Sequence, residues 1–183
     1  EREGLIRYVA EQPPYNLLDR RIENELIPLA QRYSLGILPW SPLAMGMLAE
    51  RYERADRHPP DSRAATVGSY AADRVSEAGV AAGRQLAELA AARGMTASQL
   101  ALLWVKDQPA VTAPIIGPRT EAQLQDALAV LEMQLDEQTA AALDQIVSPG
   151  SAVAAFHNPS GWMKMRVTSI APLASLDEMY LPR

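Results

Sequence analysis

Cysteine is absent from this chain of 183 residues, and histidine occurs only twice. Without cysteine the chain forms neither a disulfide nor a thiolate metal site, and nothing points to an oxidising compartment. The two histidines, His58 and His157, stand far apart in sequence typical of loops. Two isolated imidazoles rarely make a metal site, because zinc draws on several ligands at once. We therefore expect no bound metal.

An excess of positive charge and long apolar runs are also missing. The formal net charge is -5, whereas a nucleic-acid-binding protein needs a basic face to replace the counterions on phosphate. No apolar run approaches the roughly 18 to 20 residues of a membrane helix. The start, Glu1-Arg2-Glu3-Gly4, resembles no signal peptide and has no Met. We expect a cytoplasmic protein without a nucleic-acid partner or membrane segment, and the missing Met suggests a chain cut from a longer one.

Three short apolar runs are present instead, at residues 5–10, 35–40 and 111–116. They contain β-branched residues and are bounded by Pro, Gly or Ser, a pattern that predicts buried strands. Residues 41–75 hold Pro, Gly, Arg, Asp and Ser without a clear period. We predict a long loop there, and long loops in compact domains are usually functional or mobile.

Amphipathic stretches between these runs predict helices. Leu29, Leu124 and Leu128 are expected to face inward, and Pro28 is expected to shorten or kink the first helix. Two segments, each beginning with Thr and ending three residues later with Gln, have the capping-box pattern that opens a helix. The expected helices cover residues 22–33 and 76–93, then run from Thr96 to Pro109, from Thr120 onward, and from Asp136 through Val147.

Apolar strands that alternate with amphipathic helices predict a parallel sheet covered by helices. Three strands cannot close a barrel, since a TIM barrel needs eight strands and about 250 residues. An open three-stranded sheet would leave unpaired edges. The pattern alone therefore predicts either a piece of something larger or an unusually small α/β layer fold.

The segment at residues 115–124 carries the most informative chemistry. A strand ends at Gly117, Arg119 follows, and a helix begins after Thr120. The N-terminal N–H groups and the helix dipole favour an anion at this position, and a guanidinium fork matches a phosphate. In α/β barrels, phosphate sites recur after the last two strands at a helix N-terminus. An ordinary turn with a surface Arg fits the segment equally well.

Two further segments also follow predicted strands. Trp40, followed by Ser-Pro and a Gly, offers a stacking face beside backbone donors, although a single Trp is more often a core residue. Gln12 carries an amide that can pair with a carboxamide, although alone it is simply a polar residue entering a loop. Because the carboxyl ends of barrel strands share one face, where active sites lie, we expect the three segments to converge.

Together these segments resemble the aldo-keto reductase family. The similarity runs from about Leu5 to Val147 and rests on Gln-Pro-Pro-Tyr-Asn at residues 12–16, Trp-Ser-Pro-Leu-Ala-Met-Gly at 40–46, and Gly-Pro-Arg-Thr at 117–120. The resemblance implies an α/β fold: the C-terminal part of a (β/α)8 TIM barrel, with about three parallel strands and flanking helices, at residues 1–150. Residues 151–183 would form a substrate-loop tail. The most similar types are bacterial reductases and relatives of potassium-channel β subunits.

The resemblance also implies bound NADP(H). Gln12 would hydrogen-bond the nicotinamide carboxamide, and Trp40 would stack on the nicotinamide ring. Backbone groups of the following segment would line the pyrophosphate, with Arg51 close by. Arg119 and its neighbours would hold the 2'-phosphate side and favour NADP over NAD. The implied cofactor-binding residues are Gln12, Trp40, Ser41, Pro42, Leu43, Gly46, Leu48, Arg51, Gly117, Arg119, Gln123 and Asp126.

The sequence departs from the family pattern in two ways. Ala127 stands where many members have an Asn, which weakens the expected adenine contact beside Asp126. The family's general-acid Tyr and its supporting residues come from the first half of the barrel, which this chain does not contain. Lys106 and Lys164 lie away from strand ends, so no catalytic residue is assigned.

A complete protein of this type would reduce an aldehyde or ketone, and this chain would supply only the cofactor-binding residues. Other readings stay open. The chain could belong to a non-catalytic NADP-binding regulatory subunit, be an inactive truncated product, or come from an unrelated barrel that binds a phosphorylated sugar at Arg119. Phe156, Trp162 and Met163 are expected to form an apolar wall at the substrate, and a homo-oligomer is possible.

Overall fold

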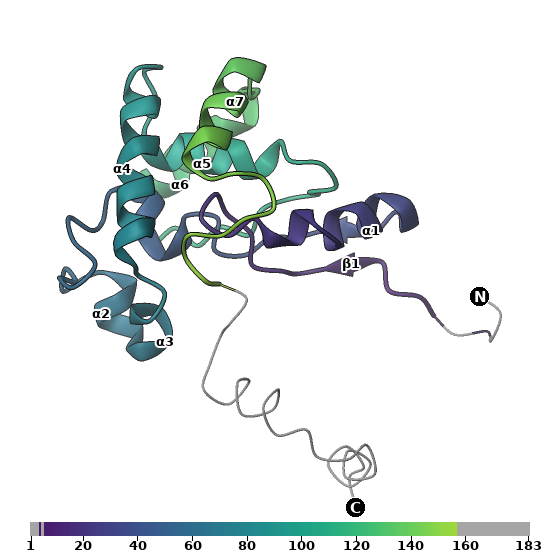
Figure 1. Ribbon diagram of the computed structural model, residues 1–183, viewed down its shortest axis with the longest axis horizontal. Coiled ribbons are helices and arrows are strands. Elements are labelled where there is room, and N and C mark those ends of the chain that lie inside the picture. Colours follow the sequence, from purple (N-terminus) through teal and green to yellow (C-terminus); the bar gives the residue numbers. More distant parts are fainter. Residues whose placement is uncertain (1–3, 5, 157–183) are drawn as a thin grey trace, which may run out of the picture.

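The computed structural model describes Gly4 and residues 6–156, and every structural statement below concerns these residues. Both short strands lie within residues 10–37, and the described chain after them is largely helical (Figure 1). The bounds of the strands and helices are β1 (Ala10–Glu11), η1 (Arg21–Glu23), α1 (Leu26–Tyr33), β2 (Gly36–Ile37), η2 (Ala44–Ala49), α2 (Arg63–Val67), α3 (Ser69–Ala72), α4 (Glu77–Ala91), α5 (Ala97–Lys106), α6 (Glu121–Leu128), η3 (Ala129–Glu132) and α7 (Glu137–Ile146).

Three parallel segments form the centre of the sheet. β1 pairs with β2 in parallel, and a parallel bridge joins Ile37 of β2 to Val111. The amide of Thr112 donates to the carbonyl of Ile37 at 2.8 Å. The parallel order of the three runs is therefore confirmed, but the pairing is shorter than predicted, and residues 111–116 contribute one bridge rather than a strand.

The prediction that residues 5–10 form a buried strand is wrong. Ile6 is 100% exposed, Tyr8 88% and Val9 69%. This segment extends away from the rest of the molecule, past α1 (Figure 1). Within the described residues β1 has a paired neighbour only in β2, so nothing covers the apolar side chains of its outer edge.

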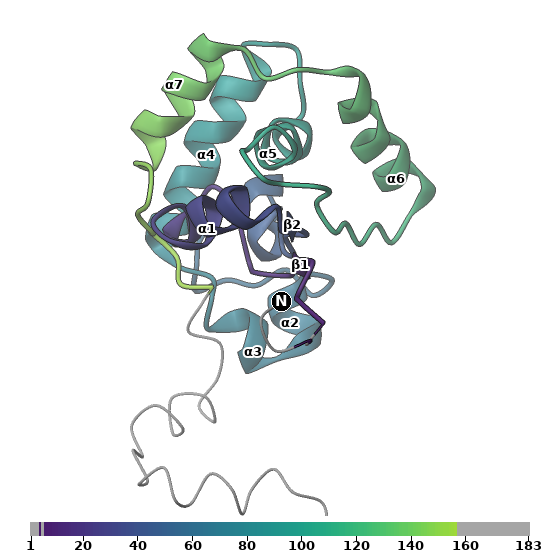
Figure 2. The ribbon, with the colours of Figure 1, turned by 90° about the vertical axis from the view of Figure 1, so that its right-hand side faces the viewer.

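Four helices pack side by side in the order α7, α4, α5 and α6, as Figure 2 shows with the strands below α5. Local sequence sets where they begin. Thr96 and Gln99 form the predicted capping box at α5. Asp136 accepts the amide of Thr139 at α7. At α6 only half of the predicted box forms: Thr120 accepts the amide of Gln123, but the Gln123 side chain accepts the amide of Arg119 instead of that of Thr120.

The burial of two helices differs from the prediction. No residue of α6 is buried, and Leu124 and Leu128 are 37% and 43% exposed. In α1, Leu29 is 45% exposed and Ile27 is buried instead. Pro28 lies in the first turn of α1, where N–H groups have no partner within the helix, so it shortens the helix without breaking it.

The predicted loop at residues 41–75 is partly helical, since it contains η2, α2 and α3. η2 packs closely on α4 because of two glycines. A Cβ atom on Gly83 would lie 2.2 Å from the carbonyl oxygen of Met47, and one on Gly79 would lie 2.7 Å from the sulfur of Met47. The face of α4 that carries these two glycines therefore fixes the backbone that follows β2.

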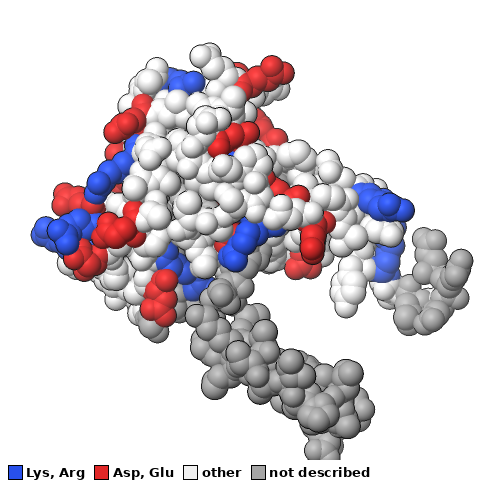
Figure 3. All heavy atoms as spheres, in the orientation of Figure 1, with Lys and Arg blue, Asp and Glu red and all other residues white. Residues whose placement is uncertain are grey.

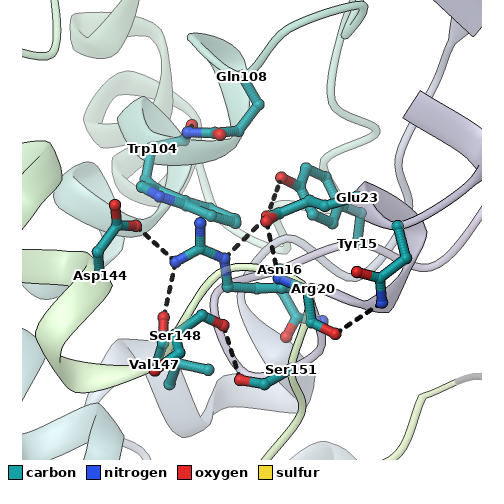
Figure 4. Close-up of polar contacts among 12 residues, drawn as sticks. Tyr15, Asn16, Arg20, Glu23, Trp104, Gln108, Asp144, Val147, Ser148 and Ser151 are labelled. Carbon is teal, nitrogen blue, oxygen red and sulfur yellow. Dashed lines mark hydrogen bonds and ion pairs between the residues drawn. The ribbon is translucent and has the colours of Figure 1, made fainter. Parts of the chain in front are cut away.

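A buried guanidinium joins the segment after β1 to α5 and α7 (Figure 4). Arg20 donates to Glu23 at 2.8 Å, to Asp144 at 2.7 Å and to the carbonyl of Val147 at 2.6 Å. Its Cζ atom also lies 5.0 Å from the ring centroid of Trp104. Because breaking a buried ion pair leaves an uncompensated charge, this cluster holds η1 and the residue before it against the end of α7.

The surface gives no basic face on the side drawn in Figure 3, where Lys and Arg are interspersed with Asp and Glu. None of the helices in the described part of the chain combines the length and hydropathy needed to span a bilayer. The described residues also contain no group of three or more His, Cys, Asp or Glu arranged to hold a metal ion.

Candidate functional site

A cleft of about 630 Å³ lies where the chain leaves β2 and where residues 115–119 lead into α6. Its volume falls in the range of small-molecule sites, roughly 300–1,000 Å³. All the cofactor-binding residues predicted from the sequence line it, except Gln12 and Leu48. Those it brings together are Trp40, Ser41, Pro42, Leu43, Gly46, Arg51, Gly117, Arg119, Gln123 and Asp126.

The turn after β2 forms one wall of the cleft and has an unusual backbone. Ser41, Ala44 and Met45 have φ angles of 57°, 49° and 59°. Left-handed backbone costs about 1–3 kcal/mol at a non-glycine residue and persists only where surrounding contacts enforce it. Here the amide of Ala44 donates to Ser41 at 2.9 Å, and the Tyr52 hydroxyl donates to the carbonyl of Met45 at 3.1 Å. Such strain commonly marks a ligand clamp.

Gly46 ends this turn at φ 104°, a conformation that requires glycine. A Cβ atom here would lie 3.0 Å from Cγ of Arg51 and 3.5 Å from the ring of Tyr52. The absence of a side chain therefore lets the stem of Arg51 lie against the turn, and the amide of Arg51 donates to the Gly46 carbonyl at 3.1 Å. This arrangement holds the Arg51 guanidinium beside the strained turn.

The opposite wall is the N-terminus of α6. The amide of Arg119 donates to Oε1 of Gln123 at 2.8 Å, and Thr120 caps the helix. Gln123 therefore supports the backbone at Arg119. As at every helix N-terminus, the remaining first-turn N–H groups have no partner inside the helix, which favours an anion in front of it.

One residue, Asp61, links the two cationic walls through its carboxylate and its main-chain carbonyl. Asp61 forms an ion pair with Arg51, and its carbonyl accepts a hydrogen bond from Nη1 of Arg119 at 3.0 Å. The Arg51 hydrogen bond, with a smaller contribution from Arg119, holds the pKa of the Asp61 carboxyl below its usual value. Asp61 is exposed and is therefore an accessible counter-ion for this end of the cleft.

Arg63 also lines the cleft, although the sequence analysis did not predict it. Its Nη2 lies 3.7 Å from the point that a Cβ atom on Gly117 would occupy. The signal for it was the Ser62 cap that opens α2, but only the fold brings α2 to this cleft. Three arginines, Arg51, Arg63 and Arg119, and one carboxylate, Asp126, line the cleft, so its lining carries a net positive charge in a chain of net charge -5.

Smaller and apolar groups also line the cleft. Ser98 and Leu102 come from α5, and Ala127 comes from α6. Asp126 accepts a hydrogen bond from the hydroxyl of Thr96 at 3.1 Å. A flat aromatic group with polar edges suits this combination of apolar surface and hydrogen-bonding groups.

Three predicted residues do not line the cleft. Gln12 is exposed and borders a separate hollow of about 450 Å³ beside η1 and α1. Leu48 is fully buried in the hydrophobic core. Phe156 is also fully buried, with its amide bonded to Asp19, because residues 151–156 pack against the core instead of forming a free tail. Trp162 and Met163 lie outside the described residues.

No Tyr, His or Lys lines the cleft among the described residues. Tyr15 donates its hydroxyl to Glu23 in the core at 2.7 Å, and burial, reinforced by Glu23, raises the pKa of this phenol. Tyr52 donates to the strained turn. The described cleft therefore offers cations, backbone groups and an indole, and Asp126 is the one carboxyl among the side chains that line it.

Known proteins provide an independent comparison. The sequence matches the family model described as "Aldo/keto reductase family" over residues 1–148. It is 34% identical over 146 residues to the uncharacterized oxidoreductase YrpG of Bacillus subtilis, covering 80% of this chain and 42% of that protein. It is 35% identical to a Schizosaccharomyces pombe protein assigned by name to the voltage-gated potassium channel β subunits, covering 78% of this chain and 42% of that protein.

The fold has a counterpart among solved structures. The glycerol dehydrogenase of Gluconobacter oxydans superposes with a TM-score of 0.62 at 26% identity, over 76% of this chain and 42% of that chain. The chain thus spans about two fifths of the length of the relatives that it matches. The likeness confirms the predicted fold class, part of a TIM barrel.

Proposed function

Because the chain belongs to the aldo/keto reductase family, we propose that it binds NADPH in the cleft between the Trp40 turn and α6. The observation that carries the proposal is the convergence of Arg51, Arg63 and Arg119 on one cleft that also contains an indole. A dinucleotide phosphate has the charge, and an adenine and a nicotinamide have the flat apolar faces, that this lining suits.

The residues present fit the group at each part of the cleft. The Trp40 indole offers a stacking face to the nicotinamide. The strained turn at Ser41–Gly46, with Arg51, would bind the pyrophosphate. Arg63 and Arg119, beside the N-terminus of α6, would hold the 2'-phosphate, since guanidinium forks bind a phosphate monoester bidentately. Gln12 borders the separate hollow. Its proposed hydrogen bond to the nicotinamide carboxamide requires its side chain to turn toward Trp40.

The proposed reaction of the whole protein is carbonyl reduction. When bound, NADPH supplies the hydride that the carbonyl carbon of an aldehyde or ketone accepts, while the oxygen takes a proton. This chain's residues bind and orient the dinucleotide and exclude water from the Trp40 face. The proton would come from a residue outside the described cleft lining, so we propose that this chain by itself holds the cofactor without turnover.

A second candidate function is a cofactor-binding regulatory subunit without catalysis. It is favoured by the similarity to a protein assigned by name to the channel β subunits and by the absence of Tyr, His and Lys from the described lining. Reduction of an aldehyde by the whole protein at a rate above that of free NADPH would exclude it.

The proposal is tested by titrating the protein with NADPH and with NADH while following Trp fluorescence. Arg119→Ala should weaken NADPH binding by about 10- to 100-fold, the value of one charge-assisted hydrogen bond, and should change NADH binding little. Arg57→Ala, which removes an exposed guanidinium outside the cleft lining, is the matched control and should change neither. Equal losses for both dinucleotides in Arg119→Ala would refute the 2'-phosphate site.

A further inference from the structure

Asn16 belongs to the Gln-Pro-Pro-Tyr-Asn segment at residues 12–16, yet the proposed cofactor site gives it no role. Its side chain is fully buried. It uses both ends of its amide: Nδ2 donates to the carbonyl of Ser41 at 3.1 Å, and Oδ1 accepts the amide of Leu18 at 3.0 Å. Asn16 therefore joins the segment after β1 to the turn after β2, and it does so without lining the cleft.

The Ser41 carbonyl accepts two of the hydrogen bonds that hold the Ser41–Gly46 turn in shape. It accepts a hydrogen bond from the amide of Ala44 at 2.9 Å as well as the one from Asn16. Ser41 itself has a φ of 57°. Since a left-handed non-glycine residue persists only where its surroundings enforce it, a second, rigid donor on this carbonyl favours the observed turn over relaxed alternatives.

Few side chains suit this position. It requires an N–H donor toward Ser41 and an acceptor for Leu18 on one short, planar group, which the Asn amide supplies. An ionised Asp has the same shape and keeps the acceptor, but it has no donor and would point an anionic oxygen at the Ser41 carbonyl. A buried carbonyl facing such a group loses its hydrogen bond and meets a repulsive charge.

We propose that Asn16 is a positioning residue for dinucleotide binding, an inference that rests on the proposed function. It fixes the Ser41 peptide so that the Ser41–Gly46 turn keeps its shape toward the pyrophosphate and Trp40 keeps its place at the nicotinamide. The pyrophosphate and nicotinamide are common to NADPH and NADH. Loss of Asn16 therefore weakens both dinucleotides by the same factor, unlike loss of Arg119.

The test compares Asn16→Asp with the wild-type protein in NADPH and NADH titrations. We expect both dissociation constants to rise about 10-fold or more, because a lost buried hydrogen bond and a misplaced turn act together. Asn16→Ser is the milder second variant, since a hydroxyl can still accept the Leu18 amide but is too short to reach Ser41. It should show the same loss for both dinucleotides if Asn16→Asp does not fold.

Thr139→Val is the matched control. Thr139 is equally buried and polar, and its hydroxyl bonds Arg93 and Asp136, well away from the cleft lining. It should lower the urea midpoint like the Asn16 variants while leaving both dissociation constants unchanged. Folded Asn16 variants with wild-type affinities, or a loss confined to NADPH, would overturn the inference. A wild-type protein that binds neither dinucleotide would instead overturn the proposed function and this inference with it.

Discussion

Gly83 and Gly79 offer a sharp test of how α4 positions the cleft. Both glycines lie on the face of α4 that packs against η2, one helical turn apart. A Cβ atom on Gly83 would lie 2.2 Å from a backbone oxygen, that of Met47. A Cβ atom on Gly79 would meet only side-chain atoms, of which the nearest is the flexible sulfur of Met47 at 2.7 Å. The same Gly→Ala change therefore meets backbone in one case and a movable side chain in the other.

The expected difference follows from these distances. Replacing Gly by Ala in a helix gains about 1 kcal/mol in both variants. A carbon and a carbonyl oxygen normally stay about 3.3 Å apart, so Gly83→Ala must separate α4 from η2 by roughly 1 Å. Overpacking of this kind costs about 1–3 kcal/mol, whereas in Gly79→Ala the Met47 side chain can rotate away from the new methyl group at little cost. Gly83→Ala should thus be about 2 kcal/mol less stable than Gly79→Ala.

Thermal unfolding followed by circular dichroism measures this difference. For a chain of this size about 2–4 °C of Tm corresponds to 1 kcal/mol, so Gly83→Ala should melt about 4–8 °C below Gly79→Ala. Its NADPH affinity should also fall, because η2 continues the turn that lines the cleft, while that of Gly79→Ala should not. Equal melting temperatures for the two variants would show that the close contact of α4 with η2 does not hold the turn in place.

Three further outcomes are expected. Arg51 lowers the pKa of the Asp61 carboxyl, so the ion pair is intact at a pH above the ordinary carboxyl pKa and is lost only as the pH falls through the lowered pKa. An NMR titration should find a higher midpoint for Asp61 in Arg51→Gln. An unchanged midpoint would contradict the pairing. Arg20→Met removes a buried guanidinium and should cost up to about 3–5 kcal/mol in urea unfolding, so a loss below about 1 kcal/mol would argue against the cluster of Figure 4. The uncovered apolar side chains of Ile6, Tyr8 and Val9, just before β1, should make the chain self-associate, and Val9→Lys should reduce this association in light scattering; unchanged association would contradict a contact at this edge.

Local sequence was sufficient wherever the controlling contacts lie within a few residues. Thr96 and Asp136 begin α5 and α7 as predicted, because a cap bonds an amide three residues away. The three apolar runs align in parallel in the predicted order. Gly117 and Arg119 stand before α6 as expected, since this turn is set by adjacent residues. The family resemblance, resting on three short segments, is confirmed over residues 1–148.

Contacts between distant segments could not be inferred in the same way. Arg63, the first residue of α2, lines the cleft because the fold brings the start of α2 to residues far away in sequence. Leu48 follows the cofactor segment in sequence, but η2 turns its side chain into the core. Leu124 and Leu128 have the helical spacing of buried residues, yet they are exposed because periodicity identifies an apolar face without identifying what covers it.

The amino-acid sequence by itself determined the order of the segments, the caps of the helices and the cationic residue before α6, because each depends on neighbours along the chain. Tertiary structure alone decided which of those groups meet. It brought Arg51, Arg63 and Arg119 to one cleft and set the buried amide of Asn16 against the carbonyl of Ser41. Most of these groups lie tens of residues apart, and the distances between them depend on contacts between distant segments, such as those of α4 with η2, of β1 with β2 and of α5 with α6.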